Sequence, residues 1–205
     1  FDNDKLKNTI EVRFPKGKEK LKLLDETDIA ISAETLLIAD ESGVLAMAGL
    51  MGGFDSAVSN QTKNILIESA FFKPEIIIGE ARQYGLYTES SHRFERGVDP
   101  ELQQMAIERA SELILMLCDG NAGPITEEKN DVEIPKNKEI LLRETQIKRL
   151  LGIDFEEKFV VDSFVRLGMT CEYGKNEWKV IPPSHRFDIK IEADLIEELA
   201  RIYGY

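Results

Sequence analysis

One segment divides this chain into two parts, and it constrains the fold more than any other feature. Residues 121–138 are rich in Glu, Lys, Asn and Pro and poor in aromatic side chains, which is typical of a linker between domains. The 205 residues, 42% of them hydrophobic, suffice for one large core or two small ones. The linker favours two, and we expect one domain over residues 1–133 and a second over residues 134–205.

The first part is predicted to contain mainly β-structure followed by helices. Period-two alternation or short apolar runs predict strands at residues 9–14, 20–24, 28–31, 35–39, 43–50 and 64–70. Pro74 at its start and Gly85 at its end favour a helix over residues 75–84. Asp99-Pro100 predicts the start of a further helix that Gly120 ends, and its apolar stripe is typical of core packing.

The second part has the pattern of a small module of mixed structure. Helices are expected over residues 145–151, 155–167 and 192–203, with a hairpin of residues 169–173 and 177–181 between the second and the third. This order is similar to a winged helix. The fold class expected for the whole chain is α+β, with a mixed or antiparallel sheet and packed helices followed by the winged-helix-like module.

Charge and cysteine content limit the possible functions. The net charge is −12, whereas a nucleic-acid-binding protein usually carries a basic surface, so any RNA contact needs a local basic spot. Such spots occur at Arg82, Arg93, Arg96 and His185-Arg186. The two cysteines, Cys118 and Cys171, lie far apart and fit a reducing compartment. No apolar run approaches the roughly 20 residues that span a membrane.

Two features of the first part could form a binding site. The run Ala48-Gly49-Leu50-Met51-Gly52-Gly53 follows a predicted strand, and its glycines permit either a tight turn or close approach of a ligand to the backbone. Glu68 is a lone carboxylate in an apolar run, which indicates either a solvated face or an acceptor that faces a pocket. The residues alone do not decide between a turn and a ligand site for the glycine run, or between a solvated face and a pocket for Glu68.

A third candidate is an acidic cluster near the C-terminus. Asp194, Glu197 and Glu198 share one face of the predicted last helix, and Asp188 precedes it. The four carboxylates repel one another unless a cation or Arg and Lys side chains compensate. The cluster is therefore either a solvated face or a set of oxygen ligands that suits Mg²⁺.

The tetrapeptide Ser-His-Arg-Phe occurs twice, at residues 91–94 and 184–187. We interpret His92 and His185 as hydrogen-bonded structural histidines, and the sequence shows no nucleophile with triad spacing.

Several motifs resemble the β subunit of bacterial phenylalanyl-tRNA synthetases. They are Met51-Gly52-Gly53, the run from Glu68 to Phe72, the run from Thr88 to Pro100, and the run from Pro182 to Asp188 with Tyr203-Gly204-Tyr205. The resemblance implies a B3/B4 editing domain that ends near residue 133 and a B5 domain after it. It implies that the B3/B4 domain hydrolyses tyrosine mistakenly attached to tRNA(Phe).

The resemblance also assigns the residues of that editing site. Glu68 falls on the position that reads the tyrosine hydroxyl, and the glycine loop with Ala48, Gly49 and Gly52 lines the pocket. Thr88 and Ser90 fall on its far wall. A positioned water is expected to cleave the ester, with no side chain as nucleophile.

For the second part, the resemblance implies Mg²⁺ ligands at Asp188, Asp194, Glu197 and Glu198, in a site shared with the α subunit. The ATP and phenylalanine sites of the whole enzyme belong to that subunit. The implied partners are the α subunit, in an α2β2 heterotetramer, and tRNA(Phe). The implied location is the cytoplasm, without membrane contact.

Two positions depart from the family pattern. Relatives commonly read His-Ala-Phe-Asp where this chain begins at Phe1-Asp2, so we expect weak or absent editing by the isolated chain. Ser90 replaces an Ala of some relatives, which changes the pocket wall. The alternative is a non-catalytic scaffold that docks RNA and the α subunit, and the surroundings of Glu68 distinguish the two. A free-standing editing hydrolase is disfavoured by the attached B5-like module.

Overall fold

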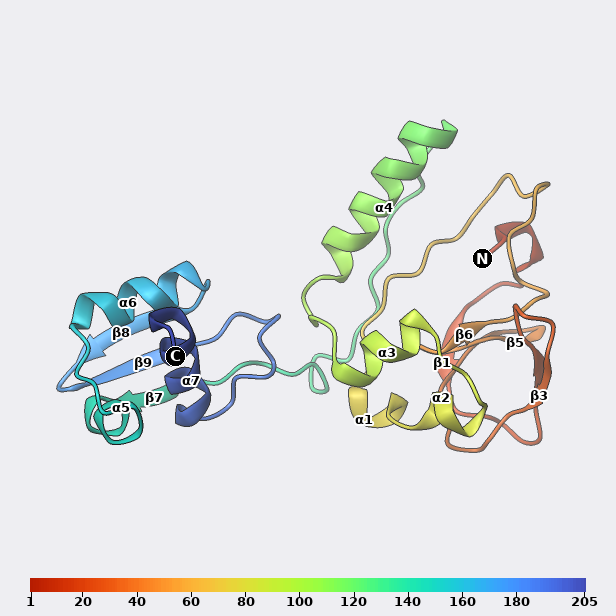
Figure 1. Ribbon diagram of the computed structural model, residues 1–205. Coiled ribbons are helices and arrows are strands. Elements are labelled where there is room, and N and C mark those ends of the chain that lie inside the picture. Colours follow the sequence, from red (N-terminus) through yellow and green to blue (C-terminus); the bar gives the residue numbers. More distant parts are fainter. The chain divides into compact units, whose positions relative to one another are not determined.

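The computed structural model describes all 205 residues and divides them into two compact units (Figure 1). Unit 1 comprises Phe1–Val98 and Leu102–Gly123, and unit 2 comprises Asp99–Glu101 and Pro124–Tyr205. Both combine antiparallel sheets with packed helices, so the predicted α+β class is confirmed.

Unit 1 is built on short antiparallel strands. Its elements up to residue 96 are η1 Asn3–Lys5, β1 Glu11–Arg13, β2 Lys20–Lys22, β3 Asp28–Ala30, β4 Leu37–Asp40, β5 Gly43–Met47, β6 Met51–Gly52, α1 Pro74–Ile77, α2 Glu80–Gln83 and α3 Glu89–Arg96. The four-stranded sheet has the order β1-β4-β5-β6, and β2 pairs with β3 separately. All four residues of β4 are buried, and Leu37 with Met47 forms part of the core on which α1 packs through Ile77.

Two predicted elements of unit 1 differ from the structure. The helix predicted for residues 75–84 is two short helices, because Gly79 takes a left-handed conformation (φ 85°) between them. Residues 64–70 were predicted to form a strand, but only Ile65 makes a bridge, to Asp2. Asn64 and Leu66 bond to the backbone of Phe1 and Asn3, but no strand pairs with residues 67–70, and a strand needs a partner along its length.

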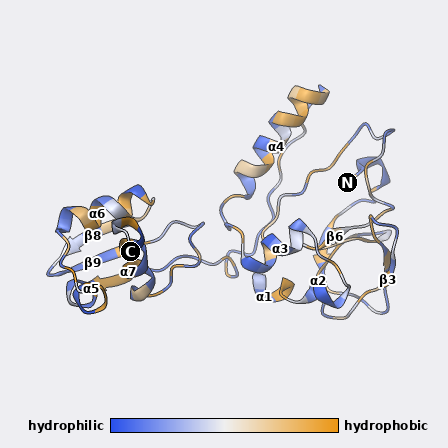
Figure 2. Cartoon of the chain, in the orientation of Figure 1, coloured by the Kyte–Doolittle hydropathy of each residue, from blue (hydrophilic) through white to orange (hydrophobic).

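Helix α4, Gln103–Cys118, also departs from the expectation. It begins after Leu102 rather than at Pro100, and it buries none of its side chains. Met116 is 70% exposed, and Figure 2 shows apolar residues along this helix. The predicted core packing of its apolar stripe is wrong for this structure, because Leu113 and Leu117 are exposed and no residue of α4 joins the hydrophobic core of unit 1. No helix of the chain combines the length and the apolar character that crossing a membrane requires.

Unit 2 follows the predicted order of helices and hairpin, with one added strand. Its elements are β7 Ile140–Arg143, α5 Glu144–Leu151, α6 Glu157–Arg166, β8 Thr170–Gly174, β9 Glu177–Ile181 and α7 Glu192–Tyr203. The sheet order is β7-β9-β8, so the unpredicted β7 pairs with the second strand of the hairpin. Lys175 and Asn176 both have positive φ, which suits a two-residue hairpin turn. Leu195 and Leu199 of α7 pack with Trp178 and Phe164 in the core.

Candidate functional site

The predicted glycine loop is a tight turn, Ala48–Leu50, between β5 and β6. Gly49 has a left-handed conformation (φ 70°), and a Cβ there would lie 3.3 Å from side-chain atoms of Phe72, Ile77 and Phe94. Both the backbone conformation and the close packing therefore favour glycine at this position. The N–H groups of Ala48 and Leu50 are hydrogen-bonded to backbone carbonyls, whereas the N–H of Gly49 has no partner.

Two hydroxyl groups at the start of α3 bond to this turn, one from its N-cap Thr88 and one from Ser90. Thr88 Oγ1 donates to the carbonyl oxygen of Leu50 (2.8 Å), and Ser90 Oγ donates to that of Gly49 (2.9 Å). Thr88 also caps α3, since its Oγ1 accepts from the backbone N–H of Ser91 (2.9 Å). The structure thus joins Gly49, Thr88 and Ser90 by direct hydrogen bonds, and their role as the lining of one pocket stays a prediction.

Ala48 and Gly52 flank the turn. Ala48 is buried, and its N–H donates to the carbonyl oxygen of Leu36 (2.9 Å). Gly52 lies in β6, and its carbonyl oxygen accepts from the N–H of Leu24 (3.1 Å). A Cβ at Gly52 would lie 3.2 Å from Leu24, so this glycine makes room for a neighbouring strand end.

Glu68 lies in the extended segment between β6 and α1, where its side chain is exposed. Its carboxylate makes no hydrogen bond and no ion pair, and no hydrogen bond links it to the turn or to α3. Enough protein atoms surround the group that desolvation raises the pKa of Glu68, an effect that the amino group of Phe1 opposes. Glu68 is therefore reachable from solvent and keeps its oxygen acceptors free.

Next to Thr88 lies a half-open depression of about 400 Å³. Its lining comprises Ile78, Gly79, Ala81, Arg82, Leu86, Tyr87, Thr88, Glu89, Ser91, His92 and Glu95. Tyr87 is 89% exposed, and the Arg82 guanidinium has no hydrogen-bond or ion-pair partner. Of the two acids, Glu89 pairs with Arg93 (3.3 Å) and Glu95 accepts from the N–H of Gly79 (3.3 Å). The depression thus offers an open aromatic ring and a free positive charge on an acidic protein.

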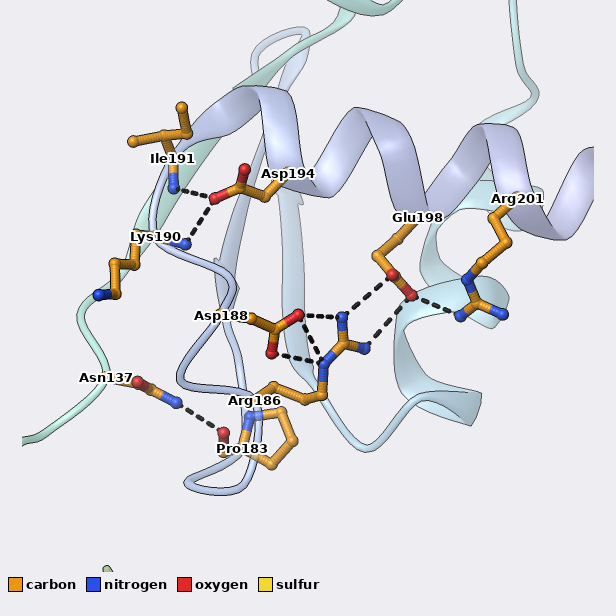
Figure 3. A network of polar contacts seen from close by, with 9 residues as sticks. All are labelled: Asn137, Pro183, Arg186, Asp188, Lys190, Ile191, Asp194, Glu198 and Arg201. Atoms are coloured by element: carbon orange, nitrogen blue, oxygen red, sulfur yellow. Dashed lines mark hydrogen bonds and ion pairs between the residues drawn. The ribbon is translucent and has the colours of Figure 1, made fainter. Parts of the chain in front are cut away.

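In unit 2, Arg186 lies between two of the predicted metal ligands (Figure 3). Its Nε and Nη2 donate to Asp188 at 2.9 and 2.8 Å, and its Nη2 and Nη1 donate to Glu198 at 3.0 and 3.3 Å. Arg201 adds a bond to Glu198 Oε2 (2.5 Å). Hydrogen bonds from Arg186 are the main reason that the pKa values of Asp188 and Glu198 lie below their ordinary values.

The other two predicted ligands do not join this pair. Asp194 Oδ2 accepts from the backbone N–H groups of Lys190 (2.8 Å) and Ile191 (2.9 Å), which stabilises the start of α7 (Figure 3). Glu197 is exposed. Among all 205 residues, no group of three or more His, Cys, Asp or Glu side chains is placed to hold a metal ion. The donor set of this chain therefore does not fit Mg²⁺ as it stands.

Arg186 and Arg201 were not predicted as partners of the acidic cluster, nor Ser91 as part of the cap of α3. A signal for Arg186 existed, since it lies two residues before Asp188 and since a set of carboxylates needs a compensating charge. Ser91 had a weaker signal: with Thr88 it forms the reciprocal pair of a capping box, in which Ser takes the place of the usual acid.

Both units match known domain families. The family model of the B3/4 domain matches residues 1–119, and that of the tRNA synthetase B5 domain matches residues 140–205. The boundary expected between residues 133 and 134 lies outside both matches and stays a prediction.

The chain is also similar to curated proteins and to a solved structure. It is 50% identical over 205 residues to the phenylalanine–tRNA ligase beta subunit of Idiomarina loihiensis and 52% identical over 209 residues to that of Colwellia psychrerythraea. Each alignment covers 100% of this chain and 26% of the relative. A crystal structure of an N-terminal fragment of the phenylalanyl-tRNA synthetase beta-subunit from Pyrococcus horikoshii matches with a TM-score of 0.52 at 15% identity, covering 100% of this chain and 59% of that one.

Fold and matches together define a two-domain module of the aminoacyl-tRNA synthetase class. More specifically, the chain belongs to the B3/4 domain family, followed by a B5 domain, and it corresponds to that region of phenylalanine–tRNA ligase beta subunits. It spans about a quarter (26%) of the length of these relatives.

Proposed function

We propose that unit 1 is an editing domain that hydrolyses Tyr-tRNA(Phe) within a cytoplasmic phenylalanine–tRNA ligase of α2β2 composition. The observation that carries this proposal is Glu68, a carboxylate without hydrogen-bond partners whose pKa is raised by desolvation. A group of this kind has acceptors to offer to a ligand, and binding a hydroxyl donor there replaces lost water contacts.

Selection of tyrosine over phenylalanine then follows from one hydroxyl group. Tyrosine donates to the Glu68 carboxylate, whereas phenylalanine covers the same carboxylate and gives it no donor. An acceptor that is covered without a partner is costly, and sites built on this difference discriminate by about 10⁴-fold or more. The correctly charged Phe-tRNA(Phe) is thereby rejected.

The turn and α3 supply the groups for ester cleavage. Thr88 and Ser90 bond to the carbonyl oxygens of Leu50 and Gly49 and so fix the turn, in which the N–H of the half-buried Gly49 is an unpaired donor. Such a donor stabilises the oxyanion that forms when water attacks an ester carbonyl. No side chain of the site is needed as a nucleophile, because a positioned water performs the attack.

The depression beside Thr88 supports contact with the RNA end. Tyr87 offers an open ring on which a base can stack, and Arg82 offers an unpaired guanidinium for a phosphate. Both lie next to the wall of the proposed editing site, where the 3′ end that carries the amino acid must enter. This local positive charge can contact RNA although the net charge of the chain is −12.

The test is deacylation by the complete enzyme carrying Glu68→Gln, with Glu75→Gln as the matched control. Glu75 is an exposed acid in the first turn of α1. We expect Glu68→Gln to lower the hydrolysis rate of Tyr-tRNA(Phe) by about 10²-fold, while charging with phenylalanine is unchanged. Equal hydrolysis rates in wild type and Glu68→Gln would remove Glu68 from the proposal.

A second candidate function is a non-catalytic scaffold that docks RNA and the α subunit. Two observations favour it: the exposed position of Glu68 and the exposed apolar side chains of α4. Under this alternative, Glu68→Gln leaves deacylation unchanged, and Arg82→Gln with Tyr87→Ala weakens tRNA binding without changing any hydrolysis rate. The same deacylation assay, with tRNA affinity measured alongside, therefore separates the two functions.

A further inference from the structure

Arginine side chains of the same chain neutralise two carboxylates of the acidic cluster in unit 2. The two carboxylates of Asp188 and Glu198 are matched by the two guanidiniums of Arg186 and Arg201, so their charges cancel. The side chains of Arg186 and Glu198 are only 21% and 11% exposed, which keeps water from replacing their contact. Paired and largely covered charges of this kind are weakly screened by salt.

We infer that the Arg186 guanidinium takes the place of a divalent cation between Asp188 and Glu198, so that the arginine and a metal ion exclude each other. Mg²⁺ requires oxygen ligands at about 2.1 Å in near-octahedral geometry. The oxygens that Asp188 and Glu198 could give are bonded to Arg186 from both sides (Figure 3). A metal ion among them would also be repelled by the guanidinium.

The ion pairs of Arg186 also connect two segments of the chain, as a bound metal ion would. It ties the segment after β9 to α7, since Arg186 and Asp188 belong to that segment and Glu198 to the helix. Asn137 holds the same segment from its other side, because its Nδ2 donates to the carbonyl oxygens of Pro182 (3.2 Å) and Pro183 (2.6 Å). The segment is thus fixed at both ends by side chains of this chain.

The experiment is a titration of the chain with Mn²⁺, which accepts the same oxygen ligands as Mg²⁺ and whose free concentration is read by electron paramagnetic resonance. Wild type should bind no ion tighter than about 1 mM, and Arg186→Gln should bind one ion at least about tenfold tighter. Adding Glu198→Gln to Arg186→Gln should abolish that binding. Arg166→Gln is the matched control, since Arg166 is an exposed arginine of the same unit, at the end of α6.

Two further results decide the inference where Arg186→Gln folds poorly. Arg186→Lys keeps the positive charge, so it should bind Mn²⁺ as weakly as wild type. Circular dichroism should show that about 10 mM Mg²⁺ restores the fold of Arg186→Gln, because a cation can then replace the arginine. The inference is overturned if wild type binds one ion tighter than about 1 mM, or if Arg186→Gln is folded and binds no tighter than wild type. It is equally overturned if Arg186→Gln stays unfolded with Mg²⁺.

Discussion

The tetrapeptide Ser-His-Arg-Phe occurs in both units, and the two copies bury different side chains. In the first copy, on α3, Ser91 is buried and Phe94 packs against the core, while the Arg93 side chain is 70% exposed. In the second copy, in the turns before α7, the arginine is the covered residue: Arg186 is 21% exposed and lies between two carboxylates.

Secondary structure explains the difference. On a helix, residues three apart share a face, so Ser91 and Phe94 point to the core together and Arg93 points away. The second copy is not helical, so no such rule links Ser184 to Phe187, and Phe187 lies outside the hydrophobic cluster of unit 2. The same tetrapeptide therefore stabilises unit 1 through its aromatic ring, which packs against the core. It stabilises unit 2 through its arginine, which pairs with two carboxylates.

Removal of the aromatic ring should give the largest difference between the copies. Phe94→Ala should lower the free energy of unfolding by about 3 kcal/mol, because Phe94 contacts Phe72 (ring centroids 5.2 Å apart) and closes over Gly49. Phe187→Ala should cost about 1 kcal/mol. Urea unfolding of both variants measures this, and equal costs would show that the two rings are equivalent despite their different surroundings.

Substitution of the arginine should destabilise the second copy more than the first, the reverse of the order expected for the phenylalanine. Arg186→Gln should cost about 2 kcal/mol without added metal, since it leaves the largely covered Glu198 with only Arg201 as a partner. Arg93→Gln should cost less than about 0.5 kcal/mol, because both partners of the Arg93–Glu89 pair are exposed. The same urea experiment applies, and a loss for Arg93→Gln as large as for Arg186→Gln would contradict our account of both copies.

Elements that depend on residues adjacent in the chain could be predicted from the sequence. Helix α7, the glycine stop after α5 and the hairpin of β8 and β9 were predictable, because each depends on residues adjacent in the chain. The break at Gly79, the absence of a strand at residues 64–70 and the exposure of α4 were not, because each depends on which distant segment comes close.

The candidate site divides in the same way. The glycine turn could be predicted from its composition, whereas the bonds from Thr88 and Ser90 to its carbonyls require the tertiary fold. The four acids of the cluster were visible in the sequence, but their pairing was not: only the fold shows that an arginine twelve residues before Glu198 reaches it.

Low pH should destabilise the second copy, because it weakens the ion pairs of Arg186 with Asp188 and Glu198. The pKa values of Asp188 and Glu198 lie below their ordinary values of 3.8 and 4.5, so the ionised carboxylates favour the folded state. This contribution is complete above about pH 4.5 and is lost as the pH falls through the lowered pKa values. The melting temperature of wild type should therefore fall from pH 6 to pH 3 more steeply than that of Arg186→Gln, by differential scanning calorimetry at about 0.1 M salt. Parallel curves would remove the ion pair from the explanation.

Substitution of the serine should give the smallest difference in stability between the two copies, and the larger loss is expected for the copy on α3. Ser91 Oγ donates to the carbonyl oxygen of Thr88 (2.9 Å) and accepts from its N–H (3.2 Å), so Ser91→Ala breaks the reciprocal cap of α3 and should cost about 1 kcal/mol. Ser184 makes no side-chain hydrogen bond of this kind, and Ser184→Ala should change stability by less than about 0.5 kcal/mol. Because the cap fixes Thr88 over the turn at Gly49, Ser91→Ala should also speed amide hydrogen exchange at Leu50 and Ser91, measured by NMR. Unchanged exchange at both amides would show that the turn is held without the cap.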